Sequence, residues 1–305
     1  MAEDTSGSNP TTRNDINRFT FAEHDVRGEL VQLSSSYNAL CDKHEYPAPV
    51  AKLLGELLAV TSLLTATLKF EGHINLQLQG SGALNFATVN GRHDQKLRGL
   101  ARTRAEITDE SLLGMLGDDA LLILTLTPEQ GERYQGMVRV EDNSLATAVE
   151  SYFAQSEQLP TRIWLHADPA RSLCAGFMLQ VLPVVPGSAS TAVEEQTTSF
   201  EHFVTLANTL TEEEIFELNV ESILHRLFHE EDIHLFPVQQ VSFFCGCSRE
   251  RTAVALRSID RSELREIIEE DGQLVLTCDY CLVDYSYDII DVEALDSHNP
   301  PPQAQ

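Results

Sequence analysis

The sequence predicts an α+β fold, divided into an N-terminal mixed sheet-and-helix domain, a helical acidic linker and a small C-terminal module. Three observations favour this division. A helical period over residues 50–70 gives way to a period of two from residue 74 onward. Acidic residues then dominate residues 184–242, and four of the six cysteines gather near the C-terminus. A length of 305 residues suits about two domains.

The first domain, residues 18–186, is expected to contain one long buried helix and a series of strands. Leucines three and four residues apart predict the helix over residues 50–70. From residue 74 apolar and polar residues alternate, as in a half-buried strand, and Asn90-Gly91 predicts a tight hairpin turn. Helices and strands do not alternate regularly, which favours α+β over α/β. The pattern predicts strands at 19–33, 74–79, 84–88, 97–107, 121–126, 134–140, 162–166 and 177–185, and a helix at 144–158.

The linker, residues 187–240, begins in a stretch rich in Pro, Gly and Ser that ends the first domain. Residues 184–242 hold 11 acidic residues and one basic residue, Arg226. Thr211 and Glu214 have the spacing of a capping box, and Asn219 suits the start of a second short amphipathic helix. Such short helices need a docking surface to be stable. The sequence leaves open whether this stretch is a conditionally folded linker or a well-packed helical subdomain.

The charge is strongly acidic, with 47 acidic and 21 basic residues and a formal net charge of −26. This balance argues against partners that present phosphates, so neither nucleic acid nor a membrane is expected to bind. The polar residues 1–17 lack the apolar stretch of a secretory signal, which predicts a disordered arm and a cytoplasmic protein. The most apolar stretch, residues 57–68, is shorter than the roughly 20 residues of a membrane span. Residues 296–305 are expected to form a tail.

Four cysteines form two close pairs, Cys245-Gly246-Cys247 and Cys278-Asp279-Tyr280-Cys281. Two such pairs flanking a short module suit a tetrahedral site of four thiolates, and soft thiolate ligands favour zinc over magnesium or calcium. We therefore expect one Zn²⁺ per chain, in a module that spans residues 241–295. Arg249 and Arg251 follow the first pair. They would either favour reactive thiolates or form the solvated start of a helix.

Other candidate residues form weaker patterns. Cys41 and Cys174 stand alone and are expected to be small buried apolar side chains. His225 and His229 lie four residues apart on a predicted helix, but no third metal ligand is evident, so a solvated face is the preferred interpretation. The sequence contains no G-x-S-x-G, no Walker-type glycine loop and no H-E-x-x-H. We therefore expect a protein that is not an enzyme.

The chain resembles the bacterial redox-regulated holdase chaperones, the 33 kDa heat shock protein family. The resemblance covers about residues 18–295 and includes both cysteine pairs at the family's spacing. The arm before residue 18, Cys41 and Cys174 lie outside the family pattern. The other segments that carry the resemblance are 26–31 (VRGELV), 53–58 (LLGELL), 64–70 (LTATLKF), 131–136 (GERYQG), 156–162 (SEQLPTR) and 269–272 (EEDG).

This resemblance implies an ATP-independent chaperone that is inactive while it is reduced and binds one zinc through Cys245, Cys247, Cys278 and Cys281. Oxidation would form the disulfides Cys245–Cys247 and Cys278–Cys281, release the zinc, and unfold the module and the linker. The oxidised protein, usually a homodimer in this family, would then hold unfolding client proteins and protect them from aggregation.

The energetics of this exchange favour unfolding of the module. A structural zinc supplies roughly 10–16 kcal/mol of folding free energy. Two disulfides that close very short loops supply about 3–4 kcal/mol together. The difference is comparable to the whole stability of a domain, about 5–15 kcal/mol. A second class, a thiol–disulfide oxidoreductase using Cys278 and Cys281, would need a thioredoxin-like βαβ context. A third class, a zinc-ribbon adaptor, is disfavoured by the acidic charge.

Overall fold

The computed structural model describes residues 13–183 and 193–295. It divides the chain into two compact units, Met1–Phe243 and Phe244–Gln305. Both units combine helices with antiparallel strands, which confirms the α+β class. The predicted arm is wrong at its C-terminal end, because residues 14–17 form the first half of a strand in which Ile16 is fully buried. Residues 1–12 and the predicted tail, 296–305, lie outside the described residues.

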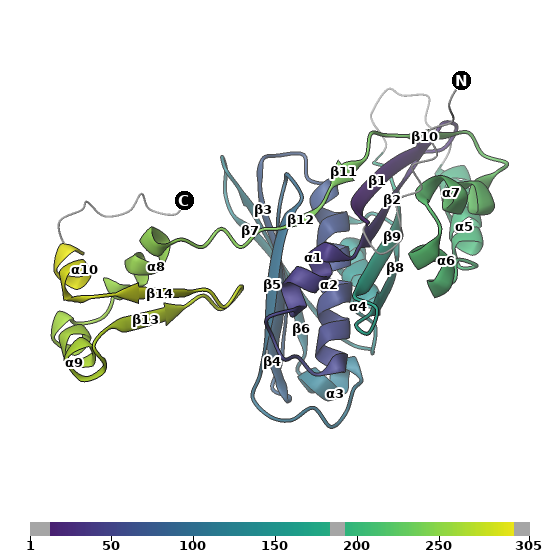
Figure 1. Ribbon diagram of the computed structural model, residues 1–305. Helices are drawn as coiled ribbons and strands as arrows, with labels where there is room; N and C mark the ends of the chain where they lie inside the picture. The colour runs from purple at the N-terminus through teal and green to yellow at the C-terminus, as the bar shows by residue number, and fades with distance from the viewer. Residues whose placement is uncertain (1–12, 184–192, 296–305) are drawn as a thin grey trace, which may run out of the picture. The chain divides into compact units, whose positions relative to one another are not determined.

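The first unit is built from two sheets with a helix between them (Figure 1). In the first sheet the strands run in the order β10-β1-β2-β9-β8, and β11 also pairs with β1. Its strands are β1 (Asn14–Phe21), β2 (Val26–Leu33), β8 (Thr161–Asp168), β9 (Leu173–Val181), β10 (Ile233–Leu235) and β11 (Gln239–Gln240).

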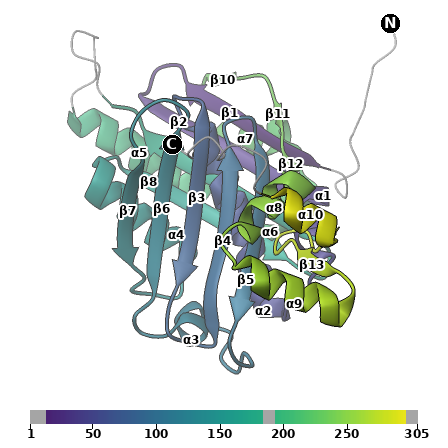
Figure 2. The same ribbon diagram turned by 90° about the vertical axis from the view of Figure 1, so that its left-hand side faces the viewer.

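The second sheet has the order β12-β5-β4-β3-β6-β7. Figure 2 shows β3 to β7 side by side. All its pairs are antiparallel except β12 with β5, which is parallel. Its strands are β3 (Gly72–Gln79), β4 (Leu84–Arg92), β5 (Lys96–Thr103), β6 (Leu121–Pro128), β7 (Tyr134–Arg139) and β12 (Ser242–Phe243).

Helix α2 (Ala48–Ala66) lies between the two sheets and forms the centre of the main core. Pro47 is its N-cap and Pro49 lies in its first turn, where the missing N–H groups cost nothing. Among the described helices it is the one long and apolar enough to cross a membrane, because it begins nine residues before the apolar stretch 57–68. Of its apolar window 78% is buried inside the protein, as in a core helix. Shorter helices flank this core: α1 (Ser35–Cys41), α3 (Leu112–Leu116), α4 (Leu145–Tyr152) and the π-helical turn Phe153–Glu157.

The hairpin turn predicted at Asn90-Gly91 is wrong, because both residues lie inside β4. A Cβ atom on Gly91 would come within 2.4 Å of the Thr65 Oγ1 atom on α2. The glycine therefore permits a close approach of helix and strand. The chain turns a few residues later, where Gln95 adopts a positive φ of 58°.

The linker helices pack on the face of the first sheet that points away from α2 (Figure 1). They are α5 (Val193–Ala207), α6 (Glu212–Glu217) and α7 (Val220–Phe228). An aromatic cluster joins them to the sheet, with Phe203 stacked on Phe21 at 3.9 Å and Phe228 edge-on to Phe21 at 5.1 Å between ring centroids. The capping box at Thr211 and the cap at Asn219 are confirmed. In this structure the stretch is thus a packed helical layer, the second of the two arrangements that the sequence left open.

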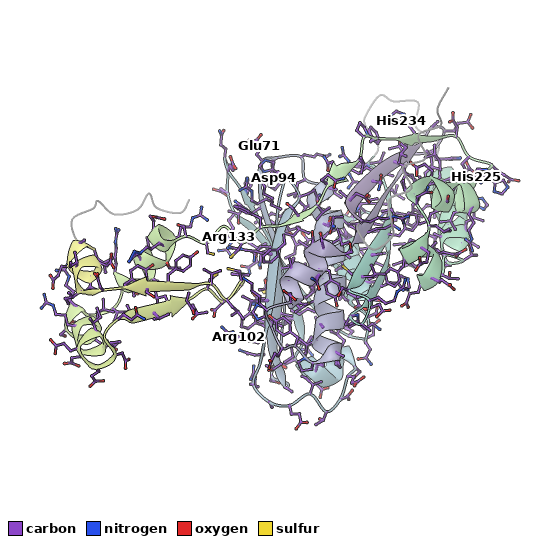
Figure 3. The ribbon with its side chains drawn as sticks, in the orientation of Figure 1. Glu71, Asp94, Arg102, Arg133, His225 and His234 are labelled. Carbon is purple, nitrogen blue, oxygen red and sulfur yellow. The ribbon has the colours of Figure 1, made fainter. Side chains whose placement is uncertain are left out.

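Residues 233–243 form an extended segment, here called the strap, that contains β10, β11 and β12. The strap pairs first with β1 of the first sheet and then with β5 of the second sheet. His234, labelled in Figure 3, lies on its first strand. The strap ends at Phe243, the last residue of the first unit.

The second unit contains a hairpin and three short helices. Its core is small. Among residues 244–295 it consists of six buried apolar side chains: Leu256, Leu264, Ile268, Leu274, Tyr287 and Val292. Domains of this size with so small a core usually need a structural metal ion or disulfides to be stable. The elements are α8 (Arg249–Leu256), α9 (Arg261–Asp271), β13 (Leu274–Thr277), β14 (Asp284–Tyr287) and α10 (Ile289–Ala294).

Candidate metal centre

The four clustered cysteines converge on one point in the second unit. The Sγ atoms of Cys245, Cys247, Cys278 and Cys281 all lie within 4.8 Å of one another. A tetrahedral zinc with bonds of about 2.3 Å has sulfur–sulfur edges of about 3.8 Å. The donor set can therefore hold a metal ion, and its size and softness fit zinc. Among the residues that the structure describes, it is the one such group of three or more possible ligands.

Two turns place the sulfur atoms. Gly246 adopts a left-handed φ of +66°, which reverses the chain between Cys245 and Cys247 just before α8 begins. The second pair occupies the turn between β13 and β14. There the Cys278 N–H donates to the Val283 carbonyl at 2.9 Å and the Leu282 N–H donates to the Cys278 carbonyl at 2.8 Å. Each close pair is thus fixed by local backbone structure, and the tertiary fold of the module brings the two pairs together.

The four thiols differ in acidity. Burial raises the pKa of Cys247, but the Tyr285 hydroxyl, which donates to its Sγ atom at 3.1 Å, and the neighbouring thiols outweigh this and lower the pKa to about 7. Burial raises the pKa of Cys245 and of Cys281. The hydrogen bond to Cys247 raises the pKa of Tyr285. Sequence patterns missed Tyr285, because its contact depends on the geometry of the hairpin.

The two arginines after the first pair form other contacts. Arg249 pairs with Asp291 at 2.5 Å and lies 4.8 Å from the centre of the Tyr287 ring. Arg251 donates from Nη1 to the Gly246 carbonyl at 2.7 Å. Both side chains are exposed, and Ser248 caps the helix on which they lie. These contacts match the solvated start of a helix, the second of the two predicted interpretations.

The remaining candidates lie away from this centre. Cys174 lies in β9 and is buried in the main core of the first unit, as expected, whereas Cys41 ends α1 and is only partly buried against that core. Burial raises the pKa of Cys41 to about 12 and that of Cys174 well above its usual value. His225, labelled in Figure 3, lies on α7 and His229 is the C-cap of that helix. Both are exposed, and their ring centroids are 6.1 Å apart. No third ligand joins them among the described residues.

Comparison with known proteins identifies the class of this fold and site. The family model described as Hsp33 protein matches residues 14–288. The 33 kDa chaperonin of Shewanella sp. (strain ANA-3) is 48% identical over 280 residues, which cover 92% of this chain and 94% of that protein. The 33 kDa chaperonin of Shewanella woodyi is 46% identical over 294 residues, 96% of this chain and 99% of that protein.

A solved structure shares the fold. The crystal structure of the 33 kDa chaperonin (heat shock protein 33 homolog) from Thermotoga maritima matches with a TM-score of 0.79 at 20% identity, over 93% of this chain and 98% of that one. The chain therefore belongs to the Hsp33 family, as the resemblance indicated.

Proposed function

We propose that this protein is a molecular chaperone of the holdase type, independent of ATP and regulated by the redox state of its four clustered cysteines. The name of its relatives, 33 kDa chaperonin, supports the chaperone function. One observation supports the regulation: four sulfur atoms within 4.8 Å of one another lie in a unit whose described residues, up to 295, form a core of six buried apolar side chains. A metal bound there contributes a large share of the stability of that unit.

The reduced protein binds one Zn²⁺ through Cys245, Cys247, Cys278 and Cys281. Zinc favours four thiolates in a closed structural site, and it lowers the pKa of each ligand enough to remove its proton. Cys247, whose pKa is already about 7, is the thiol that loses its proton most readily. The zinc joins the segment before α8 to the β13–β14 turn and so holds the two halves of the module together.

Oxidation forms the disulfides Cys245–Cys247 and Cys278–Cys281. Each pair of thiolates gives two electrons to one hydrogen peroxide, which takes up two protons and leaves as two waters. Zinc loses its ligands and departs. Two sulfur–sulfur contacts join one pair to the other, at 3.4 Å for Cys245 with Cys278 and 3.3 Å for Cys247 with Cys281. Disulfides between the pairs would keep the module closed. Peptide mapping of the oxidised protein identifies which cysteines are joined and so tests whether oxidation opens the module.

Opening of the module releases the acidic linker. Once α5, α6 and α7 leave the first sheet, they uncover the apolar surface around Phe19, Phe21 and Phe177. An exposed apolar surface binds unfolded client proteins without a shaped pocket. Acidic side chains of the linker keep the opened chaperone soluble. We further propose that the oxidised protein is a homodimer, that it acts in the cytoplasm, and that it catalyses no reaction and binds neither nucleic acid nor membranes.

Light scattering by a client protein that unfolds on heating tests this function. The client is mixed, without nucleotide, with reduced, peroxide-oxidised and re-reduced protein. We expect suppression of aggregation by the oxidised form and its loss after re-reduction with zinc. The variant Cys41→Ala serves as the matched control, because this thiol is in the first unit and is not one of the four clustered cysteines, and it should switch as the natural protein does. Equal suppression by the reduced and oxidised forms would contradict the redox switch.

A further inference from the structure

The strap covers the edges of two different sheets. Its backbone donates from Phe236 to the Arg18 carbonyl at 2.9 Å and from Val241 to the Asn14 carbonyl at 2.8 Å. The Asp232 carbonyl, immediately before the strap, accepts from the N–H of Ala22, the residue after β1, at 2.9 Å. At its other end the Ser242 N–H donates to the Gln95 carbonyl, next to β5, at 3.0 Å. An uncovered edge strand is a template for pairing with another chain. The strap therefore covers two edges, those of β1 and β5, that could otherwise pair with another chain.

Few side chains of the strap are fully buried, although Ile233, Leu235 and Phe243 pack partly against the cores of the first unit. Val241 is its one buried residue, whereas Val238 is 52% exposed and both glutamines of β11 are exposed. The strands that pair with the strap, β1 and β5, are well packed, since Ile16, Phe19 and Leu97 are fully buried. Main-chain hydrogen bonds run along much of the contact, and main-chain pairing tolerates many sequences. A different extended segment can form the same bonds.

Both ends of the strap are attached to parts of the chain that open in the proposed function. Helix α7 ends at Phe228, five residues before the strap, and Cys245 follows two residues after it. This inference rests on that function, because the strap is released only when the linker and the module let go of its ends. A short strand that pairs with a neighbouring strand on one side only has low local stability.

We propose that the vacated edges of β1 and β5 bind extended segments of client polypeptide, which add to the sheets as extra strands in place of the strap. The side chains of the strap indicate the preferred sequence on β1. Ile233 and Leu235 pack partly against the aromatic core cluster, and Phe236 lies 5.6 Å from the guanidinium carbon of Arg18. A segment with apolar residues at alternate positions, followed by an aromatic residue, reproduces these contacts.

Peptide binding to the oxidised full-length protein tests the proposal. The probe is a fluorescent peptide of about nine residues in which Val and Ile alternate with Thr and the last residue is Phe. Its matched control is the same peptide with N-methyl groups on alternate amides, which keeps the side chains and blocks main-chain pairing. We expect the methylated peptide to bind about tenfold more weakly or worse. Equal affinity of the two peptides would overturn the proposal.

Hydrogen exchange at the Ala22 amide locates the binding site in the same samples. This amide should be protected in the reduced protein, exchange faster after oxidation, and regain protection when the unmethylated peptide is added. Protection that returns without peptide as the protein concentration rises would mean that a second copy takes the edge, and it would overturn the proposal. Suppressed client aggregation without peptide-dependent protection of Ala22 would overturn the edge site and leave the proposed function intact. Absence of aggregation suppression would overturn both.

Discussion

The side-chain amide of Gln32, on β2, donates to the Ile215 carbonyl on α6 at 2.6 Å and to the neighbouring Leu218 carbonyl at 2.9 Å. Gln32 is 5% exposed, so these bonds form in a nearly dry environment. Arg13 Nη1 also donates to the Leu218 carbonyl, at 2.5 Å. The first sheet therefore satisfies the carbonyl groups that α6 leaves unpaired at its C-terminal end.

Replacement of this amide should loosen the linker. In Gln32→Leu the Ile215 carbonyl loses its buried donor, while the Leu218 carbonyl keeps that of Arg13, so the change costs about 1–3 kcal/mol of docking free energy. We expect faster hydrogen exchange in α6 and α7 of the reduced protein, and activation at lower temperature under peroxide. Gln77→Leu is the control, because Gln77 lies on β3 of the second sheet and bonds to Gln79. Unchanged exchange in Gln32→Leu would show that this amide does not hold the linker.

Truncation of Phe203 should have a larger effect on the same layer. This side chain is 1% exposed and stacks on Phe21, so Phe203→Ala costs about 3–5 kcal/mol. We expect the reduced, zinc-bound variant to suppress client aggregation in part, without peroxide. Thr205→Ala, at an exposed position of the same helix, should behave as the natural protein. A reduced Phe203→Ala protein that stays inactive while its linker amides exchange freely would separate linker release from client binding.

Glu29 should make stability depend on pH. Burial raises its pKa to about 7, and Arg27 and Arg18 offset this only in part. Because the folded state holds the proton more tightly than the unfolded state, stability falls as pH rises from about 4.5 to about 7. Glu29→Gln removes this loss, so the variant should gain up to about 3 kcal/mol relative to the natural protein between pH 5 and pH 8.

Thermal or urea unfolding of both proteins at the two pH values measures this difference. The comparison isolates Glu29 because Glu56, whose pKa burial also raises to about 7, titrates in both proteins. Glu45→Gln is the control, since Glu45 is exposed. A gain equal at pH 5 and pH 8 would show that Glu29 does not titrate in this range.

Removal of one cysteine pair should abolish zinc binding. Two thiolates hold zinc far more weakly than four, and the module lacks the core to fold without it. We expect metal analysis of the reduced Cys278→Ser, Cys281→Ser double variant to find no zinc, against one zinc per chain in the natural protein. Cys41→Ala should retain its zinc. Full zinc content in the double variant would rule out the four-cysteine site.

The sequence predicted best those features that depend on neighbours along the chain. Helix α2 follows from leucine spacing and from Pro47 and Pro49 at its start. The convergence of the four cysteines follows from two close pairs, each fixed by its own turn. The turn predicted at Asn90-Gly91 was wrong. Gly91 lies within β4 and leaves room for Thr65 of α2, and a pattern of neighbouring residues carries no information about such a contact.

Contacts between distant segments set the limit of sequence reasoning. The docking of the linker stayed open because it depends on Phe21, more than 180 residues before Phe203. The amide of Gln32 lies on a strand and bonds to a helix end far along the chain, and no spacing rule connects them. Tyr285 came near Cys247 only through the hairpin of β13 and β14.

The central claim is that zinc holds the module folded and that opening of the module leads to release of the linker from the first sheet. A peroxide titration of the full-length protein, with released zinc and hydrogen exchange followed in the same samples, tests it most directly. The account predicts one zinc released per chain as four thiols are lost. Protection in residues 200–232, which we expect to be the least protected structured part of the chain at the start, should fall in step, while amides of α2 keep theirs. Complete release of zinc with unchanged protection in residues 200–232 would contradict the account.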